Sequence, residues 1–385
     1  MSGYSCRVDA DLDAIDPGEW DSLVRACDHQ ASHRFLRVCR DARIEDARYR
    51  YARIHDGARL AAAAVLTSMT VSLDLLAPGA VRSLARAGRV VHPRFLRARV
   101  LFCGLPVSFG SSCLRFAPDA EAGRVLPLVV RAMEEFAEEV DASLFCVKEL
   151  TEAERGRADS LLDLGWFRAP SLPGTSLRIE WADFESYERA MRSGYRRQLR
   201  ASLAAGGARE LRLRVVEDWR EECPRIYPLY GQVMDHAEFR LERLPIAFFE
   251  RLAVEFGRDA RALLLEREGD LEAAAIVLDG PETMTFLLTG IDYARNGTDR
   301  AYENLVADVI AEAIRRRVKR LELGQTSYAL KSRLGGVIDP RWLYLKHRRA
   351  LPHEAIRRAS GLLFPTATVP ARRVFAARDA EAAVS

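Results

Sequence analysis

Apolar and polar positions follow the same order in two stretches of the chain that lie far apart. Residues 55–66 read HDGARLAAAAVL, and residues 267–278 read REGDLEAAAIVL. In both, a glycine next to an acidic residue separates two apolar runs, a pattern typical of the turn in a β-hairpin. We therefore predict one hairpin that turns at Gly57 and a second that turns at Gly269.

The pattern after each hairpin is also repeated. A short apolar run predicts a strand, apolar residues at three- and four-residue steps predict an amphipathic helix, and a second strand and a short helix follow. The predicted elements are a strand from residue 100, a helix over 125–140 and a strand over 143–150 in the first half, and a strand over 283–290, a helix over 299–317 and a strand over 319–324 in the second half. The short helices end in Leu164-Gly165 and Leu334-Gly335. An ordered match of this length indicates an internal repeat.

The repeat divides the chain into two predicted domains, because 385 residues are too many for one ordinary core. Strands alternating with helices predict an α/β fold with mixed sheets. We expect a first domain over 1–180, a second over 181–355, and a tail over 356–385 that packs on the surface or frays. Residues 74–99 show little periodicity and are interpreted as an insertion or a mobile flap.

The composition narrows the function classes. The net charge of +3 is too weak to indicate a nucleic-acid-binding protein from the overall balance. The seven cysteines include no CxxC pair, so we expect reduced thiols and neither a disulfide framework nor a metal site. No apolar run reaches the roughly 20 residues that cross a bilayer, and the acidic N-terminus differs from a signal peptide. We expect a cytoplasmic protein without membrane insertion.

Three segments, together with the order of elements, resemble the tandem proteins of the Gcn5-related N-acetyltransferase (GNAT) fold. These segments are YRRQLRASLAAGG (195–207), LERLPIAFFERL (241–252) and LELGQTSYALKSRLGG (321–336), and the resemblance covers most of residues 15–347. The relatives include Fem-type peptidyltransferases and N-acyltransferases of the kind linked to peptidoglycan biosynthesis. The resemblance implies two tandem GNAT domains that transfer an acyl group from acyl-CoA, as co-substrate, to an amine acceptor.

The acyl-CoA site is expected at the start of the long helix of the second half, because helix N-termini attract anions. The residues expected to contact the donor are Arg295, Asn296, Gly297, Thr298 and Arg300. The usual glycine-rich pattern is absent there, and Asp299 would repel a pyrophosphate, so an ordinary capped loop remains an equal alternative. In the first half the loop over 106–124 is longer, and we expect that copy to be degenerate and to contribute an acceptor-side wall.

Acyl transfer to an amine needs a base for the amine proton and an acid for the departing thiolate. GNAT enzymes place a tyrosine where this chain has Tyr328, so the resemblance implies an acid there. His236 titrates near neutrality and is the candidate base, and Glu322 is a further catalytic candidate that faces either the site or solvent. The residues expected to bind substrate are Asp235, Arg240 and Lys331. A packed aromatic at Tyr328 and surface positions for His236 and Lys331 are the alternatives.

Arginines concentrate just before the second hairpin. Spacings of three and four predict that Arg189, Arg192, Arg196 and Arg200 share one face of a basic helix. That face is either solvated or binds a phosphate-rich partner, such as the CoA adenosine phosphate or a tRNA acceptor stem. Fem-type enzymes use aminoacyl-tRNA but typically carry an extra helical arm, which is not evident here. A Fem-type aminoacyltransferase and a non-catalytic GNAT-like binding protein therefore remain alternatives. The absence of GxSxG and HExxH motifs favours direct transfer without an acyl-enzyme.

Overall fold

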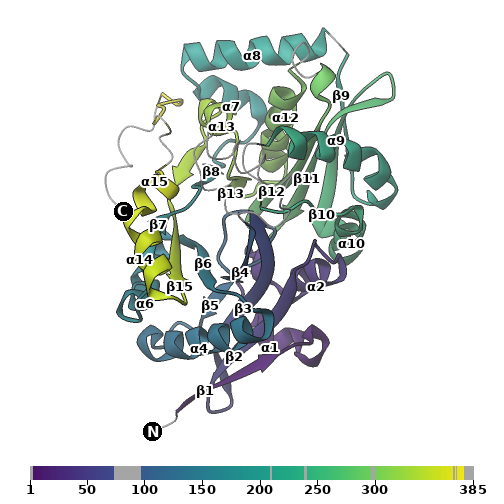
Figure 1. Ribbon diagram of the computed structural model, residues 1–385. Coiled ribbons are helices and arrows are strands. Elements are labelled where there is room, and N and C mark those ends of the chain that lie inside the picture. Colours follow the sequence, from purple (N-terminus) through teal and green to yellow (C-terminus); the bar gives the residue numbers. More distant parts are fainter. Residues whose placement is uncertain are drawn as a thin grey trace, which may run out of the picture. The chain divides into compact units, whose positions relative to one another are not determined.

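The computed structural model describes residues 3–72, 97–208, 210–237, 241–295, 300–366, 369 and 371–376. Its contacts divide the chain into two compact units, each with its own sheet (Figure 1). Unit 1 comprises Met1–Leu172, Glu238–Phe248 and Pro340–Ala367, and unit 2 comprises Pro173–Ala237, Phe249–Asp339 and Thr368–Ser385. The units are therefore not consecutive segments such as 1–180 and 181–355. Most of the insertion expected over 74–99 lies outside the described residues.

The strands and helices follow the repeated order that the pattern predicts. The strands are β1 (Tyr4–Asp9), β2 (Arg48–Asp56), β3 (Arg59–Ser72), β4 (Arg97–Cys103), β5 (Leu114–Phe116), β6 (Leu144–Thr151), β7 (Phe167–Pro170), β8 (Gly174–Arg178), β9 (Arg212–Val216), β10 (Ala260–Arg267), β11 (Asp270–Asp279), β12 (Thr283–Ile291), β13 (Arg320–Gly324), β14 (Val337–Asp339) and β15 (Arg341–His347). The helices are α1 (Pro17–Asp21), α2 (His33–Asp41), α4 (Ala122–Val140), α5 (Glu152–Ala158), α6 (Ser160–Asp163), α7 (Phe184–Ala190), α8 (Ser193–Gly207), α9 (Cys223–His236), α10 (Ile246–Phe256), α12 (Ala301–Arg315), α13 (Tyr328–Arg333), α14 (Ala350–Arg358) and α15 (Ser360–Leu363).

Both predicted hairpins are confirmed, and each turns at its glycine. The β2–β3 pairing closes at Asp56 and Arg59, with Gly57 at φ 62° in the loop. The β10–β11 pairing closes at Arg267 and Asp270, with Gly269 at φ 90°. Glycine adopts this left-handed backbone without a steric penalty, which is why the turn signals could be recognised in the sequence.

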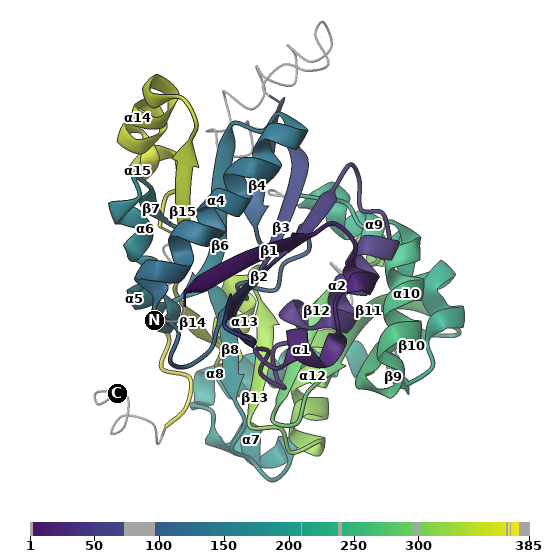
Figure 2. The ribbon, with the colours of Figure 1, turned by 90° about the horizontal axis from the view of Figure 1, so that it is seen from below.

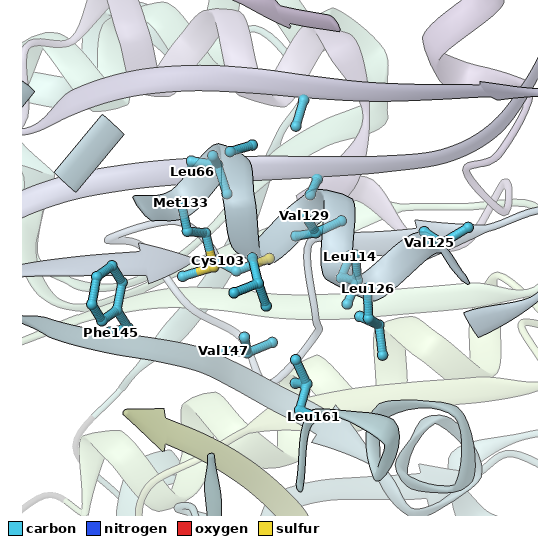
Figure 3. Packing of buried hydrophobic residues seen from close by; sticks show 14 of the residues in the cluster. Leu66, Cys103, Leu114, Val125, Leu126, Val129, Met133, Phe145, Val147 and Leu161 are labelled. Atoms are coloured by element: carbon cyan, nitrogen blue, oxygen red, sulfur yellow. The ribbon is translucent and has the colours of Figure 1, made fainter. Parts of the chain in front are cut away.

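Unit 1 places its core between one long helix and the sheet. The strand order is β1-β2-β3-β4-β6-β15-β7, and β5 pairs with β3. Helix α4 lies along one face of this sheet (Figure 2). Its apolar side packs against side chains of β3, β4 and β6, including Leu66, Cys103 and Val147 (Figure 3). The apolar residues that recur at three- and four-residue steps in the sequence therefore form the buried face of α4.

Unit 2 has the strand order β14-β8-β13-β12-β11-β10-β9. Helix α12 packs against β10 and β11, and α9 packs against β11 and β12. In both sheets a single adjacent pair of central strands is parallel, β4 with β6 and β12 with β13. This parallel pair is the feature that positions the site described below.

Each sheet takes its penultimate strand from the other half of the sequence. In unit 1, β15 lies between β6 and β7, although it follows the whole second repeat in the chain. In unit 2, β8 lies between β13 and β14, although it precedes that repeat. Neither half of the sequence therefore contains all the strands of one sheet.

The C-terminal tail contributes to the core of unit 2, so the expectation that it only packs on the surface or frays is wrong for Val374 and Phe375. Both side chains are buried. The Phe375 ring lies 4.8 Å from the Trp181 ring, measured between centroids. At Gly335 a Cβ atom would lie 2.3 Å from the Phe375 ring, so only glycine fits beneath it.

Replacing Phe375 with alanine should lower the free energy of unfolding by about 3–5 kcal/mol, because it removes a buried aromatic ring and leaves a cavity. Urea denaturation monitored by tryptophan fluorescence would measure the change. The matched control is Leu351→Ala, since Leu351 is 86% exposed and its truncation should change stability by less than about 0.5 kcal/mol. An equal and small effect of both substitutions would contradict a core role for the tail.

The prediction of one continuous basic helix over 189–200 is wrong. Helix α7 ends at Ala190, Met191 is extended at φ −70° and ψ 143°, and α8 begins at Ser193. Arg189 and Arg196 therefore lie on different helices, and three- and four-residue spacing does not align them. Arg189 instead pairs with Glu185 at 2.5 Å.

The described residues contain no helix that is long and apolar enough to cross a membrane. All seven cysteines are free thiols, and the buried ones include Cys103, Cys113 and Cys146 of unit 1. Burial raises the pKa of these three thiols, which makes the reactive thiolate form scarce at neutral pH.

Candidate active site

The site is built where the two parallel strands of unit 2 stop pairing. Strands β12 and β13 pair at Thr283–Arg320, Met284–Leu321 and Thr285–Glu322 and then diverge. A bulge in β12 leaves Leu287 unpaired, because Phe286 and Leu288 pair with neighbouring residues of β11. We call this divergence, together with helix α13 that follows β13, the strand fork. Strand separation of this kind leaves backbone groups available to a bound molecule.

The equivalent fork of unit 1 is occupied by the protein's own side chains. Strands β4 and β6 pair as far as Cys103 and Val147. Beyond them, Lys148 Nζ donates to the Leu105 carbonyl at 2.8 Å, and the Ser108 hydroxyl donates to Glu149. The Lys148 side chain passes so close to Gly104 that a Cβ there would lie 2.6 Å from it.

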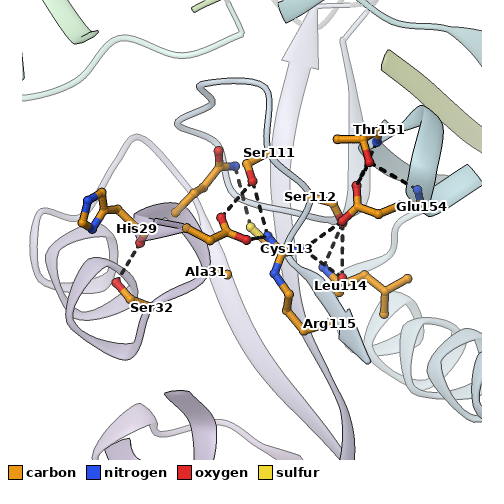
Figure 4. A network of polar contacts seen from close by, with 12 residues as sticks. His29, Ala31, Ser32, Ser111, Ser112, Cys113, Leu114, Arg115, Thr151 and Glu154 are labelled. Atoms are coloured by element: carbon orange, nitrogen blue, oxygen red, sulfur yellow. Dashed lines mark hydrogen bonds and ion pairs between the residues drawn. The ribbon is translucent and has the colours of Figure 1, made fainter. Parts of the chain in front are cut away.

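The loop after β4 is held by a further polar network (Figure 4). Arg115 pairs with Asp28 and, at 3.3 Å, with Glu154, and the Ser111 hydroxyl donates to Asp28 at 2.8 Å. Glu154 in turn accepts from the Thr151 backbone and caps α5. These contacts fix the loop in place and engage the side chains of Asp28, Arg115 and Glu154 within the protein.

Lys331 is the most unusual residue at the unit 2 fork. It lies on α13, is 3% exposed, and its ammonium group is 5.9 Å from the centroid of the Phe286 ring. Across the described part of the chain it forms no ion pair. Burial lowers the pKa of Lys331 to about 7, so a large fraction is neutral near pH 7. A buried lysine without a carboxylate is costly and is typical of functional sites.

Tyr328 begins the same helix. Its hydroxyl donates to the Pro173 carbonyl at 2.9 Å, and burial raises the pKa of the phenol. Ser327, at φ 56°, precedes it and shares a hydrogen bond with the Tyr302 hydroxyl of α12. The structure therefore places Tyr328 next to Lys331 in the fork, with its proton directed to a backbone carbonyl.

His236 ends α9 and is exposed. Its ring stacks on Tyr293, with centroids 3.9 Å apart and planes 6° from parallel. His236 Nδ1 lies 2.8 Å from the Gln232 carbonyl oxygen. Because a carbonyl only accepts, Nδ1 carries the hydrogen and Nε2 keeps a lone pair that can take a proton. Among the described residues, no hydrogen bond, ion pair or ring contact joins His236 to Tyr328 or Lys331.

Glu322 lies on β13 but is engaged elsewhere. Its carboxylate pairs with Arg320 at 2.5 Å, and Arg320 also pairs with Asp339 at 2.7 Å. Its strand neighbours Leu321 and Leu323 are in the core, so Glu322 faces the opposite side of the sheet from α12. The side chain is half-buried within this ion-pair network.

The expected donor loop shows no free basic group among its described residues. Arg295 pairs with Asp270 at 3.1 Å and Glu272 at 3.6 Å, and Arg300 donates to the Ser202 hydroxyl at 3.1 Å. The first turn of α12 also carries Glu303, which pairs with Arg333 at 3.0 Å. Asn296, Gly297 and Thr298, together with Arg240, lie outside the described residues, and Asp235 is exposed. A carboxylate already occupies the positive end of this helix.

Sequence reasoning missed the contact between α8 and α12 that supports the fork. At Gly206 a Cβ would lie 2.5 Å from the Asn304 side chain, so the helices approach closely only because residue 206 is glycine. Asn304 Nδ2 donates to the Ser202 carbonyl at 3.0 Å. The signal was present in the 195–207 segment, where small residues occur four apart, the spacing that lets helices pack closely.

The comparisons with known proteins agree with this geometry. Residues 189–332, which include β12, β13 and all but the last residue of α13, match the family model described as "Acetyltransferase (GNAT) domain". A curated Mycobacterium tuberculosis protein named "Putative 8-amino-7-oxononanoate synthase 2" is 25% identical over 333 residues, which cover 83% of this chain. The chain spans 42% of the length of that relative.

Solved structures with the same fold cover nearly the whole chain. FemX matches 86% of this chain and 96% of its own, at 12% identity and a TM-score of 0.54. The match with a tandem GNAT protein from the clavulanic acid biosynthesis pathway covers 90% of this chain and 99% of that protein's chain, at 13% identity and a TM-score of 0.53. The match with L-PGS from Bacillus licheniformis covers 91% of this chain and 96% of that protein's chain, at 11% identity and a TM-score of 0.52. These structural matches show a shared fold, which includes that of a tandem GNAT protein.

Proposed function

We propose that this chain, of which residues 189–332 match a GNAT acetyltransferase domain, transfers an acyl group from acyl-CoA to an amine of a small-molecule or peptide-like acceptor. The reaction takes place at the strand fork of unit 2. The observation that carries the proposal is Lys331, a buried lysine that forms no ion pair with any described residue and lies beside diverging parallel strands. The occupied fork of unit 1 supports the choice of unit 2.

The reaction needs charge stabilisation and two proton movements. The amine nitrogen attacks the thioester carbonyl, a C–N bond forms, and the C–S bond breaks to release a thiolate. The protonated Lys331 stabilises the oxyanion of the tetrahedral intermediate, an effect that is strong in a site without water. His236 Nε2 accepts the amine proton, and Tyr328 is the candidate donor to the thiolate.

A second donor, aminoacyl-tRNA, is favoured by one observation. The arginines near the α12 N-terminus already pair with carboxylates or a hydroxyl, so the described residues offer no cationic cradle for the CoA pyrophosphate. The likeness in fold to FemX is consistent with this alternative. An aminoacyl ester would react at the same fork, with the same need for a cation near the oxyanion.

The test is a donor panel with the full chain and a mixture of primary amines. Release of free thiol from acetyl-CoA or longer acyl-CoAs, together with an acylated amine detected by mass spectrometry, would support the proposal. Transfer that occurs only with charged tRNA and is lost on ribonuclease treatment would establish the second donor. No transfer with either donor would contradict an acyltransferase and leave a binding protein.

A further inference from the structure

A second candidate site lies in unit 1, at the end of the sheet where β2 and β4 begin. A pocket of about 460 Å³ opens there between the end of α2, the start of β2 and the start of β4. Its lining residues are Ala10, Arg40, Arg43, Glu45, Asp46, Ala47, Arg48, Tyr49, Arg50, Tyr51 and Arg99. The parallel strands β4 and β6 diverge at the opposite end of β4, after Cys103, so this pocket is separate from the fork of unit 1.

The pocket exists because one strand is shorter than its neighbour. Strand β1 pairs with β2 only from Tyr51 to Asp56, and residues 48–50 of β2 therefore have an open edge. The loop between α2 and β2 passes beside this edge with two non-glycine residues in the left-handed region, Arg43 at φ 51° and Glu45 at φ 46°. Such backbone is uncommon outside glycine.

The carboxylates of the pocket already have partners. Asp46 accepts from the Thr70 backbone at 2.9 Å, from the Thr70 hydroxyl at 2.6 Å and from Arg99 at 2.6 Å. Glu45 accepts from the Arg243 backbone at 2.8 Å. These bonds hold the pKa of Asp46 below its usual range, so its charge is present and neutralised locally by Arg99.

Three of the five arginines are also engaged. Arg40 pairs with Asp41 at 2.7 Å and with Asp13 at 2.9 Å, Arg50 pairs with Glu139 at 2.6 Å, and Arg99 pairs with Asp46. By contrast, the guanidinium groups of Arg43 and Arg48 have no partner within the described ranges. Two cations on one pocket are therefore left for a ligand.

We propose that this pocket binds a phosphorylated small molecule through the guanidinium groups of Arg43 and Arg48. Guanidinium groups match the oxygens of a phosphoryl group with paired hydrogen bonds, and a phosphoryl group offers several acceptors at once. The volume exceeds that of a single phosphate and lies in the range of small-molecule sites. A pyrophosphate or a nucleoside diphosphate fits this chemistry.

Isothermal titration calorimetry of the full chain with inorganic pyrophosphate, at constant ionic strength, tests the proposal. We expect binding by the natural chain and at least about tenfold weaker binding by the Arg43→Gln, Arg48→Gln double variant. Arg131→Gln is the control, since Arg131 is an exposed arginine of unit 1 outside the pocket.

A second arm with ADP distinguishes a nucleotide from a free anion. Tighter binding of ADP than of pyrophosphate would identify a nucleoside diphosphate, and equal binding would identify the phosphoryl groups alone; both support the site if they depend on the two arginines. Lys331→Met should bind pyrophosphate like the natural chain, because the pocket is in unit 1. No binding at millimolar pyrophosphate, or equal binding by the double variant, would overturn the proposal.

Discussion

Replacing Lys331 with methionine should lower the rate of acyl transfer by about 100-fold or more, the usual cost of losing one group that stabilises an oxyanion. The same substitution should stabilise the folded protein. The Lys331 side chain is 3% exposed, and burial lowers its pKa from 10.5 to about 7. Below pH 7 the folded protein therefore holds a buried charge that methionine removes.

The stability gain should depend on pH in a defined direction. Between pH 7 and 10.5 the unfolded lysine keeps a proton that the folded lysine has lost, so the natural chain becomes more stable as the pH rises. Below pH 7 the free energy of unfolding of Lys331→Met should exceed that of the natural chain by an amount on the order of 3–5 kcal/mol. This difference should shrink toward pH 10.5. Urea denaturation at several pH values would measure it.

Two variants separate charge from packing. Lys331→Arg keeps a cation that does not titrate, so its residual activity should not decline above pH 7, whereas kcat/KM of the natural chain should fall there as Lys331 loses its proton. Lys319→Met is the control, because Lys319 is exposed and pairs with Glu282. Full activity in Lys331→Met, or loss of activity together with loss of stability, would contradict the role given to this lysine.

Ending the chain after Asp339 should prevent unit 1 from folding, although every residue of the first half remains. The truncation removes β15, which lies between β6 and β7 and buries Tyr344 and Leu345. Both neighbouring strands would then expose unpaired edges, and the lost contacts are large against a typical stability of about 5–15 kcal/mol. Hydrogen exchange should show unprotected amides over 144–151 and 167–170.

The matched control is a chain that ends after Ala376. It keeps β15 and the buried Phe375, and it retains every described residue. Its unit 1 amides should exchange as slowly as in the longer chain. Protected amides in the chain that ends after Asp339 would show that the first half folds without the exchanged strand, contrary to the topology observed here.

The repeat could be predicted because its signals are local. The turns at Gly57 and Gly269 and the spacing of apolar residues in α4 and α12 are properties of neighbouring residues, and they gave the right element types. The exchange of β8 and β15 depends on pairing between distant segments. The residues of a short strand do not specify which sheet the strand joins, so the exchange could not be predicted from the sequence.

The candidate site divides in the same way. The resemblance identified the segment that carries Tyr328 and Lys331, but the segment reads as an exposed helix, and the burial of Lys331 arises from packing beside β12. Arg295 pairs with Asp270, which is distant in the sequence. Glu322 pairs with Arg320, two residues earlier on the same strand, and the sequence does not show which face of the sheet the two side chains share. Charge partners decide whether a group is free for a ligand, and they are set by tertiary contacts.

Hydrogen exchange of the full chain with and without acetyl-CoA is the most direct measurement of which copy carries the site. Acyl-CoA bound at the strand fork should slow exchange over 283–291 and 320–333, and it should leave strand β6 of the equivalent fork in unit 1, residues 144–151, unchanged. Protection of 144–151 without protection of the unit 2 segments, or no protection in either unit, would contradict the account.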